Sequence, residues 1–386
     1  MGTKASVSCH YQYQELFPNM PAKIPWWLPQ VGSEPERTFL TQALDNNYIN
    51  EGPLVTEFEN KIKNLVGAKF AMATPSCTVG LFLSLKALGV GHGDEVLVPD
   101  ITFIATANAV DLCGATPILV DVDPVTFTID CAAAEKKITA HTKAIMPVHV
   151  TGRGADMKAI MSLAQKHNLF VVEDAAEALL SKQGDNYLGT IGNLGCFSFS
   201  PNKTITTGQG GIIVTNDEAL YLKLKPLKDQ GRPVRGTGGD DLHDTIGYNF
   251  KMTDLQAAIG LGQLTLLDSR IERMKRTHEM YGQELKEVKE ITLFKFRAEE
   301  VPQWTDVLIP ERRDELVEFL KVHSIDSRKF WFPLHSQGAY KQDDKTFPNS
   351  THLSPQALWL PSAYTLTDED VMTVCTTIKE FFKRES

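Results

Sequence analysis

Short apolar runs that alternate with helical segments are the feature that most constrains the fold of this chain. The apolar runs are continuous rather than alternating with polar residues, which indicates strands buried on both faces. Strands are predicted at residues 95–98, 116–123, 143–150 and 169–174, and helices at 78–88, 106–114 and 155–168. Neighbouring parallel strands need a crossover connection, usually a helix. The pattern therefore predicts an α/β fold with a mostly parallel sheet that helices cover on both faces.

The second half of the chain extends this pattern. Two further strands are predicted at residues 195–200 and 211–215, and a long helical pattern covers residues 255–288. At 386 residues the chain is long enough for two domains. We therefore expect an N-terminal arm at residues 1–28, a large domain with a mixed, mostly parallel sheet at 29–265, and a smaller C-terminal α/β domain at 266–386.

Composition excludes several classes of protein. The net charge of −9 and the pI near 5.6 argue against a nucleic-acid-binding surface, which needs basic residues. No apolar run approaches the ~20 residues of a membrane span. The six cysteines are scattered, with no CxxC pair and no Cys/His cluster, so no metal site is predicted. We expect a cytoplasmic protein with no nucleic-acid or membrane partner, in a reducing compartment.

The stretch SFSPNKTITTGQGG, residues 198–211, places Lys203 among small, hydroxylated and glycine residues just after a predicted strand. Three interpretations are open for this lysine: it binds a phosphate, it forms a covalent Schiff base, or it is a solvated loop residue. A nucleotide-binding Walker A loop needs glycine before the lysine, and Asn202 stands there instead.

Other polar and aromatic residues fall where predicted strands end or helices begin, which is where ligands bind in open α/β sheets. A helix N-terminus after Ser76 also favours a phosphate. The candidates are Cys77, Thr78, Phe103, His149, Asp174 and Ser198. Taken singly, Asp174 and Thr78 read as helix caps and Phe103 as a core residue. In the order phosphate cradle, aromatic ring, carboxylate, hydroxyl and lysine, they match the needs of pyridoxal 5′-phosphate (PLP).

At the level of whole blocks, the chain resembles the DegT/DnrJ/EryC1/StrS family of sugar-nucleotide aminotransferases. The resemblance covers residues 29–379 and includes GDEVLVPDITFIATANAV, GATPILVDVD, VEDAAEA, GCFSFSPNKTITTGQGGIIVTND, GYNFKMTDLQAAIGLGQL and FWFPLHSQGAY. It implies the fold type I, aspartate aminotransferase-like architecture, with PLP bound in the large domain. The branch it is most similar to is that of GDP-perosamine synthases.

The resemblance also implies roles for particular residues. Lys203 would form the Schiff base with PLP, and Asp174 would pair with the ring nitrogen. Phe103 would cover the ring, while Cys77, Thr78 and Ser198 would hold the phosphate. Further positions are implied with less detail: Glu177 and Asn202 near the cofactor, Asn249 at the cofactor phosphate of a neighbouring subunit in an obligate homodimer, and His149, Trp331 and His335 on the substrate side.

The implied reaction moves an amino group from L-glutamate to the C4 keto group of a nucleotide-linked 4-keto-6-deoxy sugar, for glycan or O-antigen biosynthesis. A lysine at position 203 argues for amino transfer, because the dehydrating branch of the family has histidine there. Alternatives are an aminotransferase for dTDP- or UDP-linked keto sugars, acting at C3 or C4, and a non-catalytic PLP-binding regulator. Two departures concern sugar specificity: the long N-terminal arm, and Thr151, Gly152, Arg153 and Gly154 where many members have Tyr-Gly.

Overall fold

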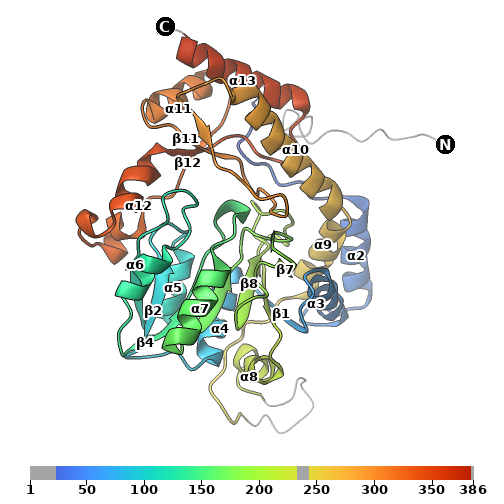
Figure 1. The fold of residues 1–386 in the computed structure, drawn as a ribbon. Helices are drawn as coiled ribbons and strands as arrows, with labels where there is room; N and C mark the ends of the chain where they lie inside the picture. Colours follow the sequence, from blue (N-terminus) through green and yellow to red (C-terminus); the bar gives the residue numbers. More distant parts are fainter. Residues whose placement is uncertain (1–22, 233–242, 384–386) are drawn as a thin grey trace, which may run out of the picture.

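The computed structural model describes residues 23–232 and 243–383, and it contains two sheets that lie one above the other in Figure 1. The lower sheet has seven strands and the upper sheet has four, and a two-stranded hairpin completes the set. Most of the predicted N-terminal arm, residues 1–22, lies outside the described residues. In the described part of the chain, no helix combines the length and the apolarity that crossing a membrane would need.

The seven-stranded sheet is mixed but mostly parallel, as predicted. Its spatial order is β1-β9-β8-β5-β4-β2-β3, and only the pairs β1–β9 and β9–β8 are antiparallel. The strands are β1 (Phe70–Thr74), β2 (Glu95–Pro99), β3 (Thr116–Val120), β4 (Thr142–Ile145), β5 (Phe170–Asp174), β8 (Leu194–Ser198) and β9 (Gly211–Thr215).

Helices cover both faces of this sheet because successive strand residues point to opposite sides. In β2, Val96 and Val98 join the apolar cluster of one face, and Leu97 joins that of the other. The first face carries α4 (Cys77–Ala87), α5 (Ala105–Leu112) and α8 (Glu218–Lys228). The second carries α3 (Pro53–Leu65), α6 (Cys131–Lys136), α7 (Met157–His167) and α9 (Asp254–Leu264).

One predicted strand ends earlier than expected. The strand predicted at residues 143–150 stops at Ile145, because Pro147 has no N–H to donate to a neighbouring strand. Val148 retains only an isolated bridge to Asp174, and the chain then forms the short 3₁₀ turn η1 (Val150–Gly152). The early stop places this turn over the carboxyl end of β5.

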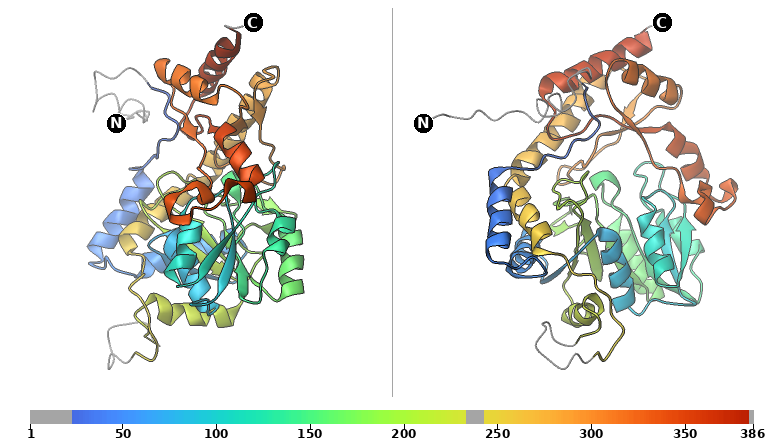
Figure 2. Two further views of the ribbon diagram at one scale, coloured as in Figure 1. Left: turned by 90° about the vertical axis from the view of Figure 1, so that its left-hand side faces the viewer. Right: turned by 180° about the vertical axis from the view of Figure 1, so that it is seen from behind.

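The helical pattern predicted over residues 255–288 is two helices, α9 and α10 (Leu267–Leu285). Thr265 N–H and Leu266 N–H donate three residues back, to Gly262 and Gln263, and this tight turn ends α9. Figure 2 shows α9 alongside α2 (Glu34–Asp45), while α10 runs up to α13 (Asp368–Lys383). The boundary predicted at residue 265 lies in this turn, and the division into domains stays a prediction.

The upper sheet is antiparallel, in the order β10-β11-β13-β12. Its strands are β10 (Thr292–Leu293), β11 (Asp306–Leu308), β12 (Arg328–Lys329) and β13 (Ala357–Trp359). Side chains from α10, α11 (Arg313–Val322) and α13 pack on it in a separate apolar cluster. The hairpin consists of β6 (Lys182–Gln183) and β7 (Asn186–Tyr187), and α12 (Pro348–Leu353) lies among short 3₁₀ turns near the C-terminus.

Residues 23–28 are the described part of the predicted arm, and they pack against the C-terminal half of the chain. Ile24 forms a bridge with Ile325. The Trp26 ring lies 5.4 Å from that of Trp304, measured between centroids. Trp27 Nε1 donates to the carbonyl of Pro201, at 3.0 Å. This segment therefore reaches both the C-terminal apolar cluster and the loop that carries Lys203.

Gly211, at the start of β9, allows the first turn of α4 to lie directly against the sheet. A Cβ atom at this position would lie 2.5 Å from the backbone N of Cys77 and from the backbone C of Ser76. Both neighbours are backbone atoms, which cannot rotate away as a side chain can. The glycine therefore determines where the N-terminus of α4 lies.

We expect Gly211→Ala to lower the free energy of unfolding by about 1–3 kcal/mol, because the added methyl group must displace backbone. Gly282→Ala is the matched control, since its Cβ would meet only Leu293 Cδ2 at 4.0 Å. In a helix interior that change should stabilise the protein by up to about 1 kcal/mol. Denaturant unfolding of both variants measures the difference. Equal effects would show that the close approach at Gly211 carries no cost.

Candidate active site

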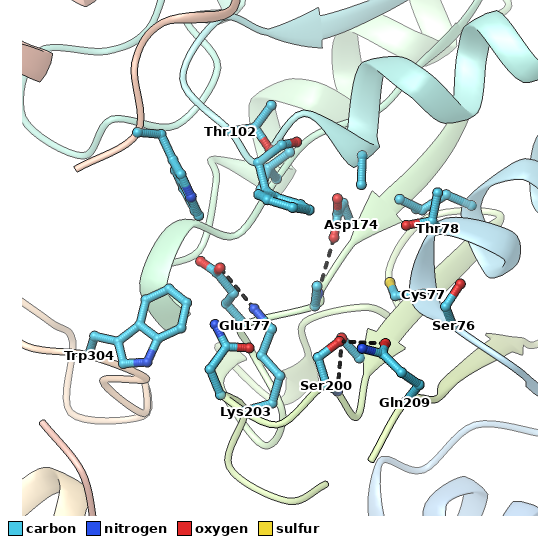
Figure 3. Close-up of a pocket in the computed structure, with 18 of the residues that line it drawn as sticks. Ser76, Cys77, Thr78, Thr102, Asp174, Glu177, Ser200, Lys203, Gln209 and Trp304 are labelled. Atoms are coloured by element: carbon cyan, nitrogen blue, oxygen red, sulfur yellow. Dashed lines mark hydrogen bonds and ion pairs between the residues drawn. The ribbon is translucent and has the colours of Figure 1, made fainter. Parts of the chain in front are cut away.

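A pocket of about 260 Å³ lies at the carboxyl ends of the parallel strands, under the C-terminal half of the chain (Figure 3). Residues from both halves line it. Those predicted from the sequence are Cys77, Thr78, Phe103, Asp174, Glu177, Ser198, Asn202, Lys203 and Trp331. The pocket therefore brings together nine of the twelve predicted site residues.

Lys203 is buried in this pocket and pairs with Glu177. The distance from Lys203 Nζ to Glu177 Oε1 is 3.0 Å, and the ammonium lies 4.8 Å from the centroid of the Trp304 ring. The second oxygen of Glu177 accepts the backbone N–H of Thr151, at 2.8 Å. Lysine is seldom buried unless its charge has a partner. The interpretation of Lys203 as a solvated loop lysine is therefore wrong.

The loop of Lys203 is fixed by side chains from distant parts of the chain. Thr204 Oγ1 donates to Gln303 Oε1 at 2.7 Å, and Arg270 Nη1 donates to the Thr204 carbonyl at 3.1 Å. The carbonyl of Asn202 accepts from Gln303 Nε2, at 3.2 Å. These bonds limit the positions that the lysine amine can reach.

Asp174 ends β5 and points into the pocket (Figure 3). Its carboxylate accepts from Thr106 Oγ1 at 2.8 Å and from the N–H of Ala176 at 3.1 Å. A turn follows β5 rather than a helix, so Asp174 is not a helix cap. Burial raises the pKa of Asp174, and within residues 23–232 and 243–383 no basic side chain forms an ion pair with it. A ligand with a positive charge would stabilise this carboxylate.

The N-terminus of α4 forms one wall of the pocket. Ser76 is the N-cap, and its hydroxyl accepts the N–H of Val79 at 3.3 Å. Thr78 therefore does not cap the helix, and it lines the pocket in the first turn, as Cys77 does. Burial and the nearby Asp174 raise the pKa of the Cys77 thiol well above its ordinary value, so this thiol is neutral. First-turn N–H groups and the helix dipole favour a bound anion here.

Two aromatic side chains form the open side of the pocket. Phe103 is 54% exposed, so the alternative that it packs in the core is wrong. Trp331 lines the pocket and also an adjoining outer groove, which Phe103 and Arg328 share. An exposed aromatic face at a pocket rim is suited to stacking on a planar ligand.

The structure does not bring His149 into the pocket. Its side chain is fully buried, with Nε2 2.9 Å from Glu173 Oε2 and Nδ1 accepting the N–H of Ala155 at 3.2 Å. Glu173 also accepts three backbone N–H groups, those of Gly189, Ile191 and Gly192. Glu173 and Asp174 point to opposite sides because neighbouring strand residues alternate. His149 thus belongs to a buried network, and its position does not support the predicted contact with substrate.

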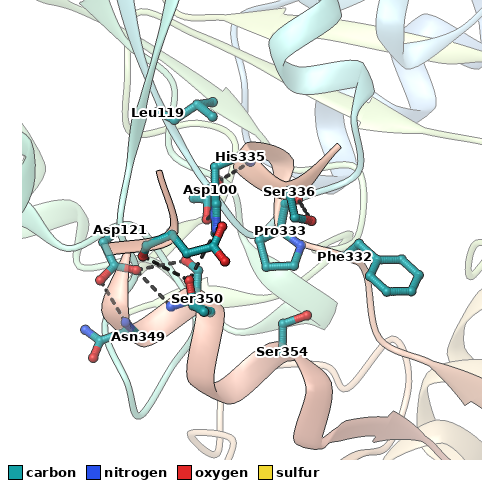
Figure 4. Close-up of polar contacts among 12 residues, drawn as sticks. Asp100, Leu119, Asp121, Phe332, Pro333, His335, Ser336, Asn349, Ser350 and Ser354 are labelled. Atoms are coloured by element: carbon teal, nitrogen blue, oxygen red, sulfur yellow. Dashed lines mark hydrogen bonds and ion pairs between the residues drawn. The ribbon is translucent and has the colours of Figure 1, made fainter. Parts of the chain in front are cut away.

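His335 also lies outside the pocket, in the cluster of polar contacts in Figure 4. Its Nδ1 is 2.6 Å from Asp100 Oδ2, and its ring stacks on Phe347 with centroids 4.5 Å apart. This cluster joins the end of β2 to the segment before α12, and the predicted substrate contact is again unsupported. Asn249 is exposed and away from the pocket of its own chain. Its predicted role concerns a neighbouring subunit and stays a prediction.

Several lining residues escaped the sequence analysis. Ser200 and Gln209 lie within the stretch around Lys203, and the Ser200 hydroxyl is 3.3 Å from that of Ser198 and 3.4 Å from Gln209 Oε1. Their polar character beside the lysine was a usable signal. Trp304 and Arg328 come from the C-terminal half, and only the tertiary structure brings them to the pocket.

The residues present fit PLP. A buried lysine, a buried carboxylate with which no described basic side chain forms an ion pair, a helix N-terminus and an exposed aromatic ring surround one cavity. The lysine can bond an aldehyde, and the carboxylate can hold a protonated ring nitrogen. The helix N-terminus can bind a phosphate, and the aromatic side chain can cover the cofactor ring. In the described part of the chain, no three His, Cys, Asp or Glu side chains form a cluster suited to a metal ion.

Comparisons with known proteins agree with this arrangement. A sequence model of the DegT/DnrJ/EryC1/StrS aminotransferase family matches residues 31–379. The GDP-perosamine synthase of Escherichia coli O157:H7 is 38% identical over 365 residues, which cover 93% of this chain and 98% of that protein. S. venezuelae DesV, solved with a ketimine intermediate, superposes with a TM-score of 0.84 at 31% identity, over 90% of this chain and 94% of that one. Spr1654 from Streptococcus pneumoniae in its PLP form gives a TM-score of 0.88 at 26% identity, with coverage of 95% and 99%.

The raised pKa of Asp174 predicts a pH-dependent cost in the cofactor-free protein. A carboxyl group whose pKa is higher in the folded than in the unfolded state loses stability as pH rises through that range. At neutral pH we therefore expect cofactor-free Asp174→Asn to melt ~1–3 °C above the wild-type protein. The gap should close as pH falls toward the ordinary pKa of the carboxyl group.

Thermal melting across this pH range measures the effect, and Thr106→Val is the opposing control. That variant removes a donor from the Asp174 carboxylate, so it should melt below the wild-type protein at neutral pH. A gap for Asp174→Asn that is absent, reversed or independent of pH would contradict the assignment of a costly buried charge.

Proposed function

Because this chain belongs to the DegT/DnrJ/EryC1/StrS aminotransferase family, we propose that it moves an amino group from L-glutamate to the C4 keto group of a GDP-linked 4-keto-6-deoxy sugar. The chain is a PLP-dependent sugar-nucleotide aminotransferase. The observation that carries the proposal is the buried amine of Lys203, which shares a pocket with the carboxylate of Asp174.

When bound, PLP supplies an electron sink for breaking the Cα–H bond of the amino donor. Lys203 Nζ would bond the cofactor at rest and, once displaced by the donor, would carry a proton to and from the donor α-carbon. Asp174 would hold the proton on the ring nitrogen. Glu177 would orient the lysine amine, with which it pairs at 3.0 Å.

The phosphate would lie at the N-terminus of α4, against Cys77, Thr78 and Ser198. Phe103 would cover the ring, and Asn202 stands beside the lysine. These assignments draw support from the shared pocket and from the free anion-binding capacity of a helix N-terminus. The neutral thiol of Cys77 adds no negative charge there.

A nucleotide-linked substrate is supported by the groove outside the pocket. Arg328, Lys329, Trp331 and Phe332 line this groove, which shares Phe103 with the inner cavity. Cationic side chains suit a diphosphate, and aromatic rings suit a base or a sugar face. Of the two cations, Lys329 already pairs with Asp314 at 3.0 Å. Among the described residues Arg328 makes no ion pair, and its guanidinium lies 4.9 Å from the Trp26 ring centroid. We propose GDP rather than dTDP or UDP as the nucleotide because the chain is similar to GDP-perosamine synthases.

We also propose a homodimer in which Asn249 reaches the partner's site. Its exposed position, near the 83% exposed side chain of Ile246, supports this arrangement. A cytoplasmic location fits the five described cysteines, which are all free. The alternative of a non-catalytic PLP-binding regulator does not require a lysine and a carboxylate so placed, and we do not favour it.

The visible spectrum tests the proposal most simply. Wild-type protein with PLP should turn yellow as Lys203 links to the cofactor, and L-glutamate should bleach the colour. A GDP-linked 4-keto-6-deoxy sugar should restore it, and the dTDP- and UDP-linked analogues should restore it more slowly. Lys203→Ala should abolish turnover, whereas Lys223→Ala, which changes an exposed lysine on α8, should retain it.

A colourless wild-type protein, or full activity in Lys203→Ala, would overturn the assignment of the lysine. A yellow protein that L-glutamate cannot bleach would instead mean a different donor or a binding protein.

Asp174→Asn tests the second assignment. We expect kcat to fall by ~10³-fold or more, because a neutral amide cannot hold the ring nitrogen in its protonated form. Steady-state kinetics at saturating L-glutamate measure this loss. A decrease below about tenfold would show that another group performs this role.

A further inference from the structure

Thr151 adopts a backbone conformation that a β-branched residue rarely takes. Its φ is 53° and its ψ is 21°, in the left-handed region. Such a conformation is costly for threonine and persists only where the surroundings hold it. Gly152 follows with a φ of 98°, and a Cβ there would lie 1.9 Å from the Val301 carbonyl oxygen. The turn is therefore pressed against the C-terminal half of the chain.

Three hydrogen bonds hold Thr151, and each uses a different polar group of the residue. Its N–H donates to Glu177 Oε2 at 2.8 Å. Its carbonyl accepts the N–H of Gln303 at 2.9 Å, and its hydroxyl donates to Asp306 Oδ2 at 3.1 Å. Two of the three partners belong to the C-terminal half, while Glu177 belongs to the pocket. Thr151 thus connects β11 to the carboxylate that faces Lys203.

Asp306 is fully buried, and its position is set by Arg153. The guanidinium of Arg153 lies 2.7 Å from Asp306 Oδ2 and donates to Oδ1 at 2.8 Å. Arg153 also lies over the Phe294 ring, 4.3 Å from its centroid, and its Nε donates to the Thr126 carbonyl at 3.3 Å. Burial raises the pKa of Asp306, and the adjacent Arg153 guanidinium opposes that rise.

Glu177 is the pocket residue that Thr151 contacts directly. Each of its two oxygens accepts one hydrogen bond. Oε2 accepts the Thr151 N–H, and Oε1 accepts from Lys203 Nζ. Glu177 is 5% exposed. If the Thr151 N–H turned away, the carboxylate would lose the donor that fixes its rotation, and its distance from the lysine would no longer be set.

We propose that Thr151, anchored by the Arg153–Asp306 ion pair, is a positioning residue that orients Glu177 toward Lys203, so that the C-terminal half of the chain controls the reactivity of the lysine amine. This inference rests on the function proposed above. It adds a positioning effect of Thr151, Arg153 and Asp306, three residues that do not line the pocket.

The test compares Thr151→Val with Thr151→Ser in the full-length, cofactor-free protein. Valine keeps the shape of threonine but cannot donate to Asp306, whereas serine keeps the donor. The readouts are the rate at which PLP becomes covalently linked, followed by visible absorbance, and the rate of bleaching by L-glutamate in a single turnover. We expect Thr151→Val to slow both by about tenfold and Thr151→Ser to remain within about twofold of the wild-type rates.

A second variant separates positioning from simple stabilisation. In Arg153→Met combined with Asp306→Leu, apolar side chains of similar size replace the buried pair, a change that is often neutral or stabilising. We expect this double variant to melt within about 5 °C of the wild-type protein. It should nevertheless link PLP about tenfold more slowly, because the Thr151 hydroxyl has lost its acceptor. Wild-type rates in this variant would mean that the pair only holds the fold, and would overturn the inference.

A third comparison uses Glu177→Gln as the background. If Thr151 acts through Glu177, adding Thr151→Val to Glu177→Gln should change the rate by less than about twofold. Fully additive effects would contradict the proposed route. A wild-type protein that never links PLP would refute the proposed function instead, whereas a wild-type protein that links PLP together with unaffected variants would refute only this inference.

Discussion

The buried ion pair between Lys203 and Glu177 is the interaction on which the rest of the site depends. Removing an ammonium and a carboxylate from water is costly, and further contacts of both groups offset part of that cost. The Trp304 ring faces the ammonium, and the Thr151 N–H completes the carboxylate. The pairing with Glu177 also fixes Lys203 Nζ at one point of the cavity. Asp174 carries a similar cost, and no basic side chain among the described residues forms an ion pair with it, so the pocket favours a ligand that brings a positive charge.

The site needs both halves of the chain. The large sheet supplies the strand ends and the N-terminus of α4, because parallel strands place their carboxyl ends at one edge. The C-terminal half supplies Trp304, Arg328 and Trp331 as the opposite wall. Gln303 bonds the lysine loop on one side and Thr151 on the other. A movement of the C-terminal half would therefore change the positions of both Lys203 and Glu177.

Much of this architecture is predictable from the sequence, and the exceptions have physical causes. The strands of the large sheet follow from continuous apolar runs, and the residues of the pocket follow from polar side chains at strand ends. Pro147 shortens one strand, and a tight turn at Thr265 divides one helical pattern, since periodicity alone does not reveal either break. The family resemblance implies a substrate-side role for His149, which also stands at a predicted strand end, and for His335. Each is instead satisfied by a buried carboxylate, Glu173 or Asp100, and only tertiary structure shows those partners. Trp304 and Arg328 were not predicted as pocket residues, because only the tertiary structure brings them to the pocket.

The central claim is that Lys203, and no other lysine, bonds the cofactor. Borohydride reduction of the protein with bound PLP, followed by digestion and mass spectrometry, tests this claim directly because reduction makes the carbon–nitrogen bond permanent. We predict that the pyridoxyl group is found on Lys203 in the peptide that contains SPNKTITTG, and that it is lost in Lys203→Ala. A label spread over exposed lysines, or one concentrated on a different buried lysine such as Lys228, would contradict the account.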